Sequence, residues 1–288
     1  MRTAYIGTAA FAATVLEVLA ASPHRPLLVI TRPPRPRGRG RQLAPTPVAE
    51  TAQRLGIEVR TPARLGDDAP ALAQAQPEVV CVCAYGALVR EPLLTDYEML
   101  NVHPSLLPRW RGAAPIERAI IAGDRETGVS IMRLVAELDA GPICEQEAVA
   151  IGPADTFGTL ADRLAASAAR LLIAALGGPR IYVPQPDAGV SYAEKIAAAD
   201  RILDPGRSAL ELERVVRALH PHIGARLASG LGVVQARIAP APVPAGELVL
   251  RDGRLLFGAR EGALELVRVK PPGGREMDTA SYVRGHAI

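Results

Sequence analysis

Short apolar segments alternate with helical patterns along the first half of the chain, and this alternation narrows the choice of fold. Strands are predicted at residues 4–6 and 27–30, a buried strand at residues 79–82, and helices at residues 11–21 and 48–55. Strands that alternate with helices in this way form a mostly parallel sheet with helices on both faces. The sequence therefore predicts an α/β fold for this region.

The first domain is predicted to end after a long helix. Apolar residues recur with helical spacing between residues 157 and 176, and a Pro- and Gly-containing segment follows at residues 184–189. A chain of 288 residues is long enough for two domains. We place the first domain at residues 1–184, a linker at residues 185–190 and a second domain at residues 191–288.

Shorter strand patterns dominate the second domain. Ser208 and Glu211 have capping-box spacing, which predicts a helix that ends at Leu219. Asp252-Gly253 is typical of a type I′ hairpin turn, because both residues of that turn need a positive φ. Strand-like runs occupy residues 233–238, 247–250, 254–257 and 264–269. The second domain is thus predicted to be a small, mostly antiparallel β-barrel or sandwich.

Asn101 and His103 are the first candidate functional residues. Residues 99–103 alternate like a short strand, so side chains two positions apart emerge on the same face. Pro104 cannot donate a ladder hydrogen bond and ends the strand at this pair. Open α/β sheets bind ligands at the carboxyl ends of their strands, which is where both side chains would lie.

Asp139, within Leu138-Asp139-Ala140-Gly141, completes a set able to act on a carbonyl-like centre. The Asn101 amide donates to a developing oxyanion, and an imidazolium at His103 does the same or delivers a proton. A carboxylate orients the imidazole or accepts a proton through water. The set needs no covalent nucleophile and indicates acyl-group chemistry. An Asn-x-His pair by itself also fits an ordinary hydrogen-bonded turn.

Five arginines crowd residues 32–41, a segment without an acidic residue. They are Arg32, Arg35, Arg37, Arg39 and Arg41, interspersed with Pro and Gly and lacking apolar periodicity. We predict an exposed loop whose charge is balanced by phosphate groups, the alternative being solvated surface charge. The net charge of +3 is too small to indicate nucleic-acid binding by itself.

Two further segments border the predicted site. The turn at residues 105–108 offers backbone groups to a planar heterocycle, and residues 82–88 leave the central strand at the same sheet edge and would wall an apolar slot. The predicted lining residues are Ser105, Leu106, Leu107, Pro108, Cys83, Tyr85 and Gly86. Trp110, between Arg109 and Arg111, is a candidate lip for base stacking and phosphates, although an ordinary packing tryptophan fits equally.

Other kinds of site are not indicated. The turn after Gly7 lacks the G-x-G-x-x-G pattern of dinucleotide loops. The three cysteines have no metal-ligand or disulfide spacing and are expected to pack, so we predict no metal. No apolar run reaches the roughly 20 residues of a membrane span, and the start shows no signal peptide. We therefore expect a cytoplasmic protein without a membrane partner, and a monomer, because no exposed apolar stripe requires another chain.

Several segments of the chain resemble those of the methionyl-tRNA formyltransferases. These enzymes are part of a wider group that shares a folate-dependent formyltransferase domain. The resemblance rests on Asn101-Val102-His103, on residues 105–116, on residues 123–129 and on residues 138–141, and it extends over nearly the whole chain. The run at residues 109–116, Gly38-Arg39-Gly40 and residues 192–196 are more particular to the tRNA enzymes.

The resemblance implies a Rossmann-like formyltransferase domain with a mostly parallel sheet, followed by a smaller OB-like β-barrel that holds the tRNA flank. It implies that 10-formyltetrahydrofolate donates a formyl group to the free amine of initiator methionyl-tRNA. By resemblance, Asn101 and His103 stabilise the oxyanion, Asp139 moves protons with ordered water, and the turn at residues 105–108 contacts folate. The residues expected to contact tRNA are Arg37, Arg39, Arg41, Arg109, Trp110 and Arg111, with Arg39 matching the motif arginine.

Departures from the family pattern occur at Ala9-Ala10, residues 203–205 and residues 220–223, and they concern tRNA contacts rather than the formyl site. The nearest alternative function is that of a related formyltransferase acting on an amino sugar nucleotide or on glycinamide ribonucleotide. Such an enzyme would have no evident need for the arginine-rich loop. A nicotinamide oxidoreductase would need the missing glycine fingerprint. An RNA-binding module without catalytic activity would not need Asn101, His103 and Asp139 together.

Overall fold

The structure is a computed structural model that describes residues 1–37 and 42–286. Contacts within the chain divide it into two compact units. The first unit comprises Met1–Ala113, Thr127–Ala150 and Ala161–Ala193, and the second comprises Ala114–Glu126, Ile151–Leu160 and Glu194–Ile288. Each unit therefore combines segments that are distant in the sequence.

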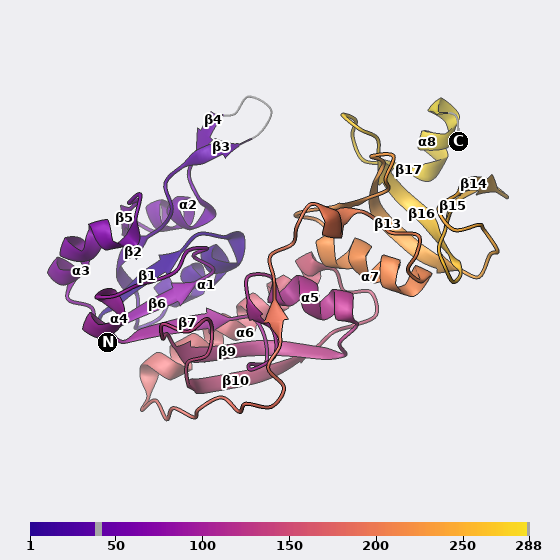
Figure 1. The fold of residues 1–288 in the computed structure, drawn as a ribbon. Coiled ribbons are helices and arrows are strands. Elements are labelled where there is room, and N and C mark those ends of the chain that lie inside the picture. Colours follow the sequence, from indigo (N-terminus) through magenta and orange to yellow (C-terminus); the bar gives the residue numbers. More distant parts are fainter. Residues whose placement is uncertain (38–41, 287–288) are drawn as a thin grey trace. The chain divides into compact units, whose positions relative to one another are not determined.

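A seven-stranded sheet forms the centre of the first unit (Figure 1). In spatial order its strands are β10 (Ile143–Ala150), β9 (Glu126–Arg133), β7 (Met99–His103), β6 (Val79–Cys83), β1 (Thr3–Gly7), β2 (Pro26–Ile30) and β5 (Glu58–Arg60). β1 pairs in parallel with β2 and β6, β2 with β5, and β6 with β7, whereas β7 and β9 are antiparallel. The predicted mostly parallel sheet is confirmed.

Helices bury apolar side chains against this sheet. They are α1 (Ala10–Ala20), α2 (Pro47–Arg54), α3 (Ala69–Ala75), α4 (Leu93–Asp96) and α6 (Phe157–Gly177), with a 3-10 turn, η1 (Leu65–Asp68), before α3. Leu72 of α3 and Leu93 of α4 are buried in one cluster with Ile6 of β1 and Val80 of β6. Full burial of such a side chain contributes ~1.5–3 kcal/mol. The predicted bounds of α1, α2 and α6 are correct to within one residue.

The arginine-rich segment departs from the irregular loop that was predicted. β3 (Arg35–Arg37) and β4 (Gln42–Ala44) pair in an antiparallel ribbon, with Arg35 opposite Ala44 and Arg37 opposite Gln42. Backbone hydrogen bonds hold such a ribbon, so its strands need no apolar alternation, and the sequence gives no periodic signal. Arg39 and Arg41 lie outside the described residues.

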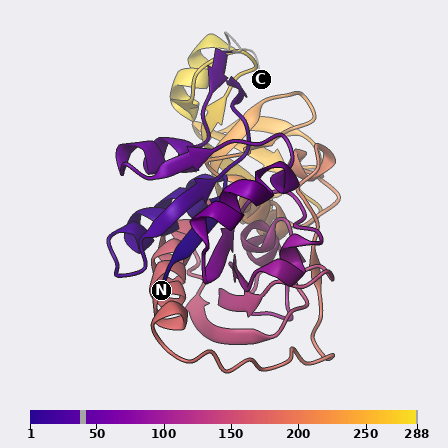
Figure 2. The same ribbon diagram turned by 90° about the vertical axis from the view of Figure 1, so that its left-hand side faces the viewer.

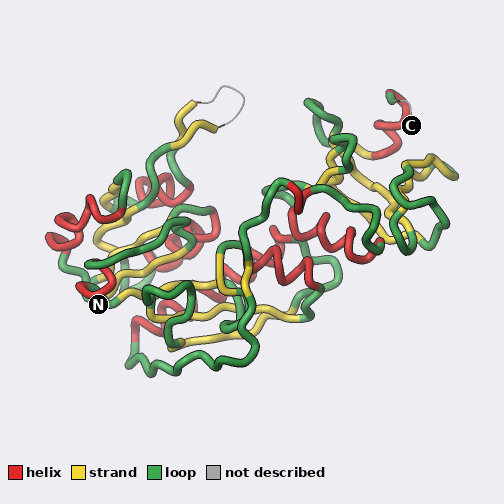
Figure 3. The backbone as a smooth tube through the Cα atoms, in the orientation of Figure 1, coloured by secondary structure: helices red, strands yellow, loops and turns green. Residues whose placement is uncertain are grey.

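A long segment without regular structure follows α6 (Figure 3). Val183 forms an antiparallel bridge with Ile143, so the segment passes beside β10, as Figure 2 also shows. It ends in the short strand β11 (Tyr192–Ala193), which pairs in parallel with β8 (Arg111–Gly112). The residues predicted to form a linker therefore belong to the first unit.

The second unit is built around an antiparallel sheet. In order, its strands are β12 (Ala225–Arg226), β13 (Gly232–Ala239), β16 (Ala263–Lys270), β15 (Arg254–Gly258) and β14 (Leu248–Arg251), with β17 (Met277–Asp278) paired to β16. The helices are α5 (Pro115–Ala122), α7 (Ala209–Leu219) and α8 (Thr279–Gly285), together with the 3-10 turn η2 (Ala199–Arg201). Leu212 and Val216 of α7 are buried with Leu255 and Leu264 from the sheet. The predicted domain of antiparallel strands is confirmed.

The local signals in this unit have the predicted geometry. Ser208 Oγ accepts a hydrogen bond from the Glu211 backbone N–H at 3.3 Å, and Glu211 Oε2 accepts one from the Ser208 backbone N–H at 2.9 Å. The bonds from Ser208 lower the pKa of the Glu211 carboxyl to about 2. Asp252 and Gly253 have φ values of 50° and 72°, as the hairpin turn requires.

Candidate active site

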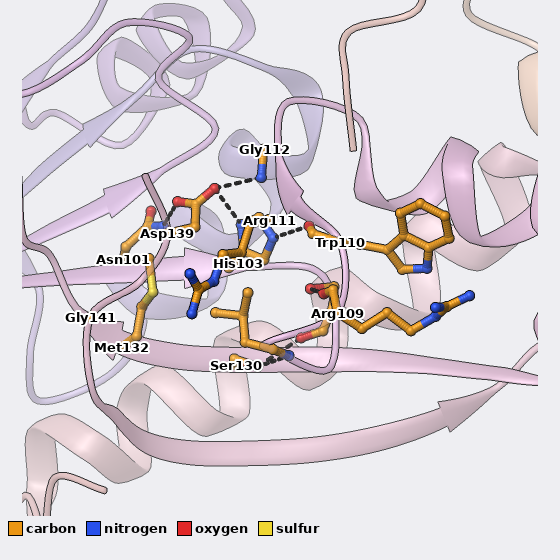
Figure 4. A network of polar contacts seen from close by, with 12 residues as sticks. Asn101, His103, Arg109, Trp110, Arg111, Gly112, Ser130, Met132, Asp139 and Gly141 are labelled. Atoms are coloured by element: carbon orange, nitrogen blue, oxygen red, sulfur yellow. Dashed lines mark hydrogen bonds and ion pairs between the residues drawn. The ribbon is translucent and has the colours of Figure 1, made fainter. Parts of the chain in front are cut away.

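Asn101 and His103 lie at the carboxyl end of β7, between β6 and β9 in the sheet. Both residues are buried, with exposed fractions of 9% and 4%. Figure 4 shows their side chains on the same side of the strand, as positions two apart should be. Parallel sheets present their ligand sites at this end, so the pair occupies the place that the strand pattern predicted.

Asp139 comes from the loop after β9 and reaches both side chains (Figure 4). Its Oδ1 lies 3.4 Å from Nδ2 of Asn101, and its Oδ2 lies 3.6 Å from Nδ1 of His103. Oδ2 also accepts a hydrogen bond of 2.8 Å from the backbone N–H of Gly112. Asp139 has a φ of 48°, an uncommon backbone conformation for a residue with a side chain. The three polar side chains predicted to converge therefore do so.

The imidazole of His103 has an oxygen partner on each side. Nε2 lies 2.8 Å from the carbonyl oxygen of Trp110. Because a carbonyl oxygen only accepts, Nε2 carries a hydrogen in this contact. Nδ1, which faces Asp139, then either holds the second hydrogen of an imidazolium or accepts a proton. Nδ1 is therefore the ring nitrogen through which the imidazole can exchange a proton.

The turn at residues 105–108 is braced by β9 and β10. Ser130 Oγ donates to the Ser105 carbonyl at 2.7 Å and accepts from the Leu107 backbone N–H at 3.2 Å. Gln146 Nε2 donates to the Leu107 carbonyl at 3.0 Å. The Ser105 hydroxyl donates to the Arg109 carbonyl at 2.6 Å. Much of the backbone expected to contact a heterocycle therefore has partners within the protein.

The residues after β6 divide into two groups. Cys83 is fully buried, which raises the pKa of its thiol to about 12, and its side chain faces Tyr5 within the core. Tyr85 and Gly86 instead line a cavity of about 330 Å³ with Thr8 and Arg32. These residues follow β6, β1 and β2, so the cavity opens at the carboxyl ends of three strands. Tyr85 also borders a second cavity of about 550 Å³, which includes Leu88.

The predicted tRNA lip is only partly at the surface. Arg109 is exposed, and its guanidinium carbon lies 4.5 Å from the centre of the Trp110 ring. Arg111 is buried, and its guanidinium donates to Gln185 Oε1 from Nε at 3.1 Å and from a terminal nitrogen at 2.8 Å. Glu137 lies 3.7 Å from the same guanidinium. Arg111 is therefore not available at the surface, contrary to its predicted place in the lip.

Two residues near the site were missed by sequence reasoning. Gly112 contributes only a backbone N–H, and Gln185 contributes an amide from a Pro-containing segment that reads as a linker. No local signal identifies either one. Within the described ranges, no three His, Cys, Asp or Glu side chains are grouped so that they could hold a metal ion. Nor do these ranges contain a helix with the length and hydropathy needed to cross a membrane.

Two family profiles match the chain. A formyl transferase profile covers residues 1–176, and a profile of the formyl transferase C-terminal domain covers residues 195–287. The methionyl-tRNA formyltransferase of Halorhodospira halophila is 42% identical over 302 aligned residues, covering 100% of this chain and 97% of that relative.

Solved formyltransferase structures have the same fold. The N-formyltransferase from Helicobacter canadensis, in complex with folinic acid and dTDP-3-aminofucose, matches with a TM-score of 0.70 at 15% identity, covering 92% of this chain and 99% of that one. Phosphoribosylglycinamide formyltransferase from Bacillus halodurans matches with a TM-score of 0.51 at 29% identity, covering 61% of this chain and 93% of that one. The chain therefore belongs to the formyl transferase family and is similar over its full length to methionyl-tRNA formyltransferases.

Proposed function

We propose that this protein transfers the formyl group of 10-formyltetrahydrofolate to the free amino group of initiator methionyl-tRNA. The meeting of Asn101, His103 and Asp139 at the end of β7 is the observation that carries the proposal. Similarity to methionyl-tRNA formyltransferases over the full length supports tRNA as the acceptor. By contrast, the likeness to the glycinamide ribonucleotide enzyme covers 61% of the chain.

In the proposed reaction, the amine of the methionyl group attacks the formyl carbon and the carbonyl oxygen becomes an oxyanion. Asn101 Nδ2 donates to this oxyanion, and protonated His103 balances its charge; one well-placed donor of this kind supplies ~2.7–4 kcal/mol. Asp139, through ordered water, accepts the proton that the attacking amine loses. The intermediate collapses by breaking the bond from the formyl carbon to the folate nitrogen, which gains a proton as tetrahydrofolate leaves.

We place the folate beside Tyr85 and Gly86, where the cavity at the carboxyl ends of β1, β2 and β6 offers a partly apolar wall. The exposed fractions of Leu88 and Leu138 are 64% and 46%. Exposed apolar side chains beside a polar site can pack against a planar ring. We also propose that the folate contacts residues 105–108. Because the Ser105 and Leu107 backbone groups are paired internally, we assign that contact to the partly buried side chain of Leu106 and to Pro108.

We assign tRNA contacts to the arginine-rich ribbon and to the Arg109–Trp110 pair. Arg37 belongs to β3, and Arg39 and Arg41 continue the same run of positive charge in the sequence. Phosphate neutralisation by such a run makes binding depend strongly on salt. Arg111 is left out of this assignment because Gln185 and Glu137 occupy its guanidinium.

The decisive test supplies purified protein and 10-formyltetrahydrofolate with three acceptors in parallel: charged initiator tRNA, glycinamide ribonucleotide and an amino sugar nucleotide. Formylation of the charged tRNA alone is the expected result. Uncharged initiator tRNA serves as the matched control, because it lacks the attacking amine. Transfer only to the ribonucleotide or to the amino sugar would overturn the proposed acceptor, and transfer to none would overturn the proposed reaction.

A further inference from the structure

The side-chain amide of Gln185 connects Arg111 to the loop that carries Asp139. Gln185 Nε2 donates to the carbonyl oxygens of Asp139 and Gly141, each at 2.8 Å. Gln185 Oε1 accepts two hydrogen bonds from the Arg111 guanidinium, at 3.1 Å and 2.8 Å. The Arg111 side chain keeps 9% of its accessible surface, so little water competes for these bonds.

The chemistry of the partners fixes the orientation of this amide. Turned by 180°, the amide would place its oxygen against two carbonyl oxygens and its NH2 group against a guanidinium that only donates. In the orientation described, both N–H groups and both lone pairs of the amide have partners. Gln185 is therefore held in one position and can hold its partners in turn.

The loop held by Gln185 needs such support. Asp139 adopts a φ of 48°, and residues with a side chain occupy that region only where surrounding contacts enforce it. Gln185 binds the carbonyl of Asp139 itself and that of Gly141 two residues later, so it clamps the backbone on both sides of Ala140. The clamp therefore fixes the backbone from which the catalytic carboxylate projects.

The same segment of chain also supports the partners of the catalytic side chains. Ser191 Oγ accepts from the Trp110 backbone N–H at 3.0 Å, and the Ser191 carbonyl accepts from the Arg111 backbone N–H at 2.9 Å. Trp110 supplies the carbonyl bound by His103, and Gly112 supplies the N–H bound by Asp139. Residues 185–193 thus brace the orientation of both the imidazole and the carboxylate.

We propose that Gln185 is a positioning residue for Asp139 and that Arg111 acts through Gln185. The catalytic meaning of this inference rests on the proposed function, because it requires Asp139 to take part in proton transfer. Gln185 and Arg111 touch no reacting atom. Their role is to keep the Asp139 carboxylate within reach of His103 and Asn101.

The test compares Gln185→Met, Gln185→Glu and Arg111→Met with Gln53→Met, which makes the same change at an exposed position of α2. We expect kcat for formyl transfer to fall about 10- to 100-fold in the first three variants, since a displacement of ~1 Å in a catalytic group costs rates of that order. The KM values for both substrates should change less than about threefold. Gln185→Glu should be as slow as Gln185→Met, because a carboxylate keeps the bond to Arg111 but repels the two carbonyl oxygens.

A double-variant cycle separates positioning from general destabilisation. In an Asp139→Asn background, Gln185→Met should lower kcat less than about twofold further, because the carboxylate that it positions is already lost. A full additional 10- to 100-fold loss in that background would overturn the proposal. Wild-type kcat in Gln185→Met would overturn it as well.

Hydrogen–deuterium exchange gives a readout that does not depend on the acceptor. Exchange of the amides at residues 137–141 should be at least about tenfold faster in Gln185→Met than in wild type or Gln53→Met, with β7 and β9 unchanged. Unchanged exchange at residues 137–141 would overturn the clamp even if the enzyme formylates tRNA. Faster exchange in a protein that formylates no tRNA would instead leave the clamp standing and overturn only the proposed function.

Discussion

Nδ1 of His103 lies 3.6 Å from Oδ2 of Asp139, and the two side chains keep only 5% and 12% of their accessible surface. So little solvent reaches the two side chains that water screens the interaction between them only weakly. The Trp110 carbonyl bound to Nε2 prevents the ring from turning away. The pair is therefore suited to act as one unit in proton transfer.

His103→Ala and Asp139→Asn are each expected to lower kcat for formyl transfer by about 100-fold or more, the scale of lost oxyanion and acid–base groups. Because the two groups act together, the double variant should be little slower than the slower single variant. Initial rates at saturating folate and charged tRNA measure the effect. Asp162→Asn makes the same chemical change at an exposed position of α6 and should leave kcat within about twofold. Near-normal turnover in both site variants would contradict the mechanism.

Gly141→Ala should displace the loop that carries Asp139. A Cβ at this position would overlap the carbonyl oxygen of Arg133, so the loop backbone must shift. We expect kcat to fall at least about tenfold, together with a loss of about 1–3 kcal/mol in the free energy of unfolding. Gly285→Ala in α8 is the matched control, since nothing lies within 4 Å of a Cβ built there. Wild-type kinetics in Gly141→Ala would show that the loop tolerates displacement.

Arg39→Ala is expected to act on the tRNA substrate rather than on the chemistry. Loss of one phosphate contact should raise KM for charged tRNA about fivefold and reduce the slope of log(kcat/KM) against log[salt] by about one. KM for 10-formyltetrahydrofolate should not change. Arg60→Ala, which removes an exposed arginine of β5, provides the comparison. An unchanged salt slope in Arg39→Ala would remove Arg39 from the proposed tRNA interface.

The Glu98 carboxylate predicts a pH-dependent contribution to stability. Arg180 donates to Glu98 at 2.7 Å and 3.0 Å, and the Tyr182 hydroxyl donates at 2.6 Å. The bond from Arg180 and the bond from Tyr182 lower the pKa of Glu98. The folded protein therefore binds this proton less readily than the unfolded chain. The stabilisation is fully present above the ordinary carboxyl pKa and is lost as the pH falls through the lowered value.

Arg180→Met should accordingly reduce the free energy of unfolding by about 1–2 kcal/mol at pH 7, since the Glu98 side chain is partly exposed and its charged hydrogen bonds are screened. Urea denaturation from pH 7 to pH 3 should show the difference from wild type shrinking below about pH 4. Arg54→Met removes an ion pair whose members are both about half exposed and should cost under about 0.5 kcal/mol. A difference that stays constant with pH would exclude Glu98 as its source.

Features set by neighbouring residues were predictable from the sequence. The Ser208–Glu211 capping box and the Asp252-Gly253 turn depend on residues within three positions of one another, and both have the predicted geometry. The placement of Asn101 and His103 on one face follows from the twofold period of a strand. Such features need no knowledge of the rest of the chain.

The role of Arg111 could not be predicted in this way. Its neighbours Arg109 and Trp110 suggest a surface lip, but its burial depends on Gln185, which lies 74 positions further along the chain. Likewise, β3 and β4 have three residues each, which is too short for a strand to show a periodic signal. In both cases the information lies in pairings between distant or polar residues, which hydrophobic patterns do not record.

The pairing of β8 with β11 has a consequence for the order in which the enzyme is made. The Gly112 N–H that binds Asp139 lies on a strand whose partner, residues 192–193, leaves the ribosome some eighty residues later. A nascent chain that has emerged only as far as α6 carries Asn101, His103 and Asp139 but not the strand that holds their neighbours. The strand that carries Gly112 therefore gains its partner late in synthesis, after the chain has passed Ala193.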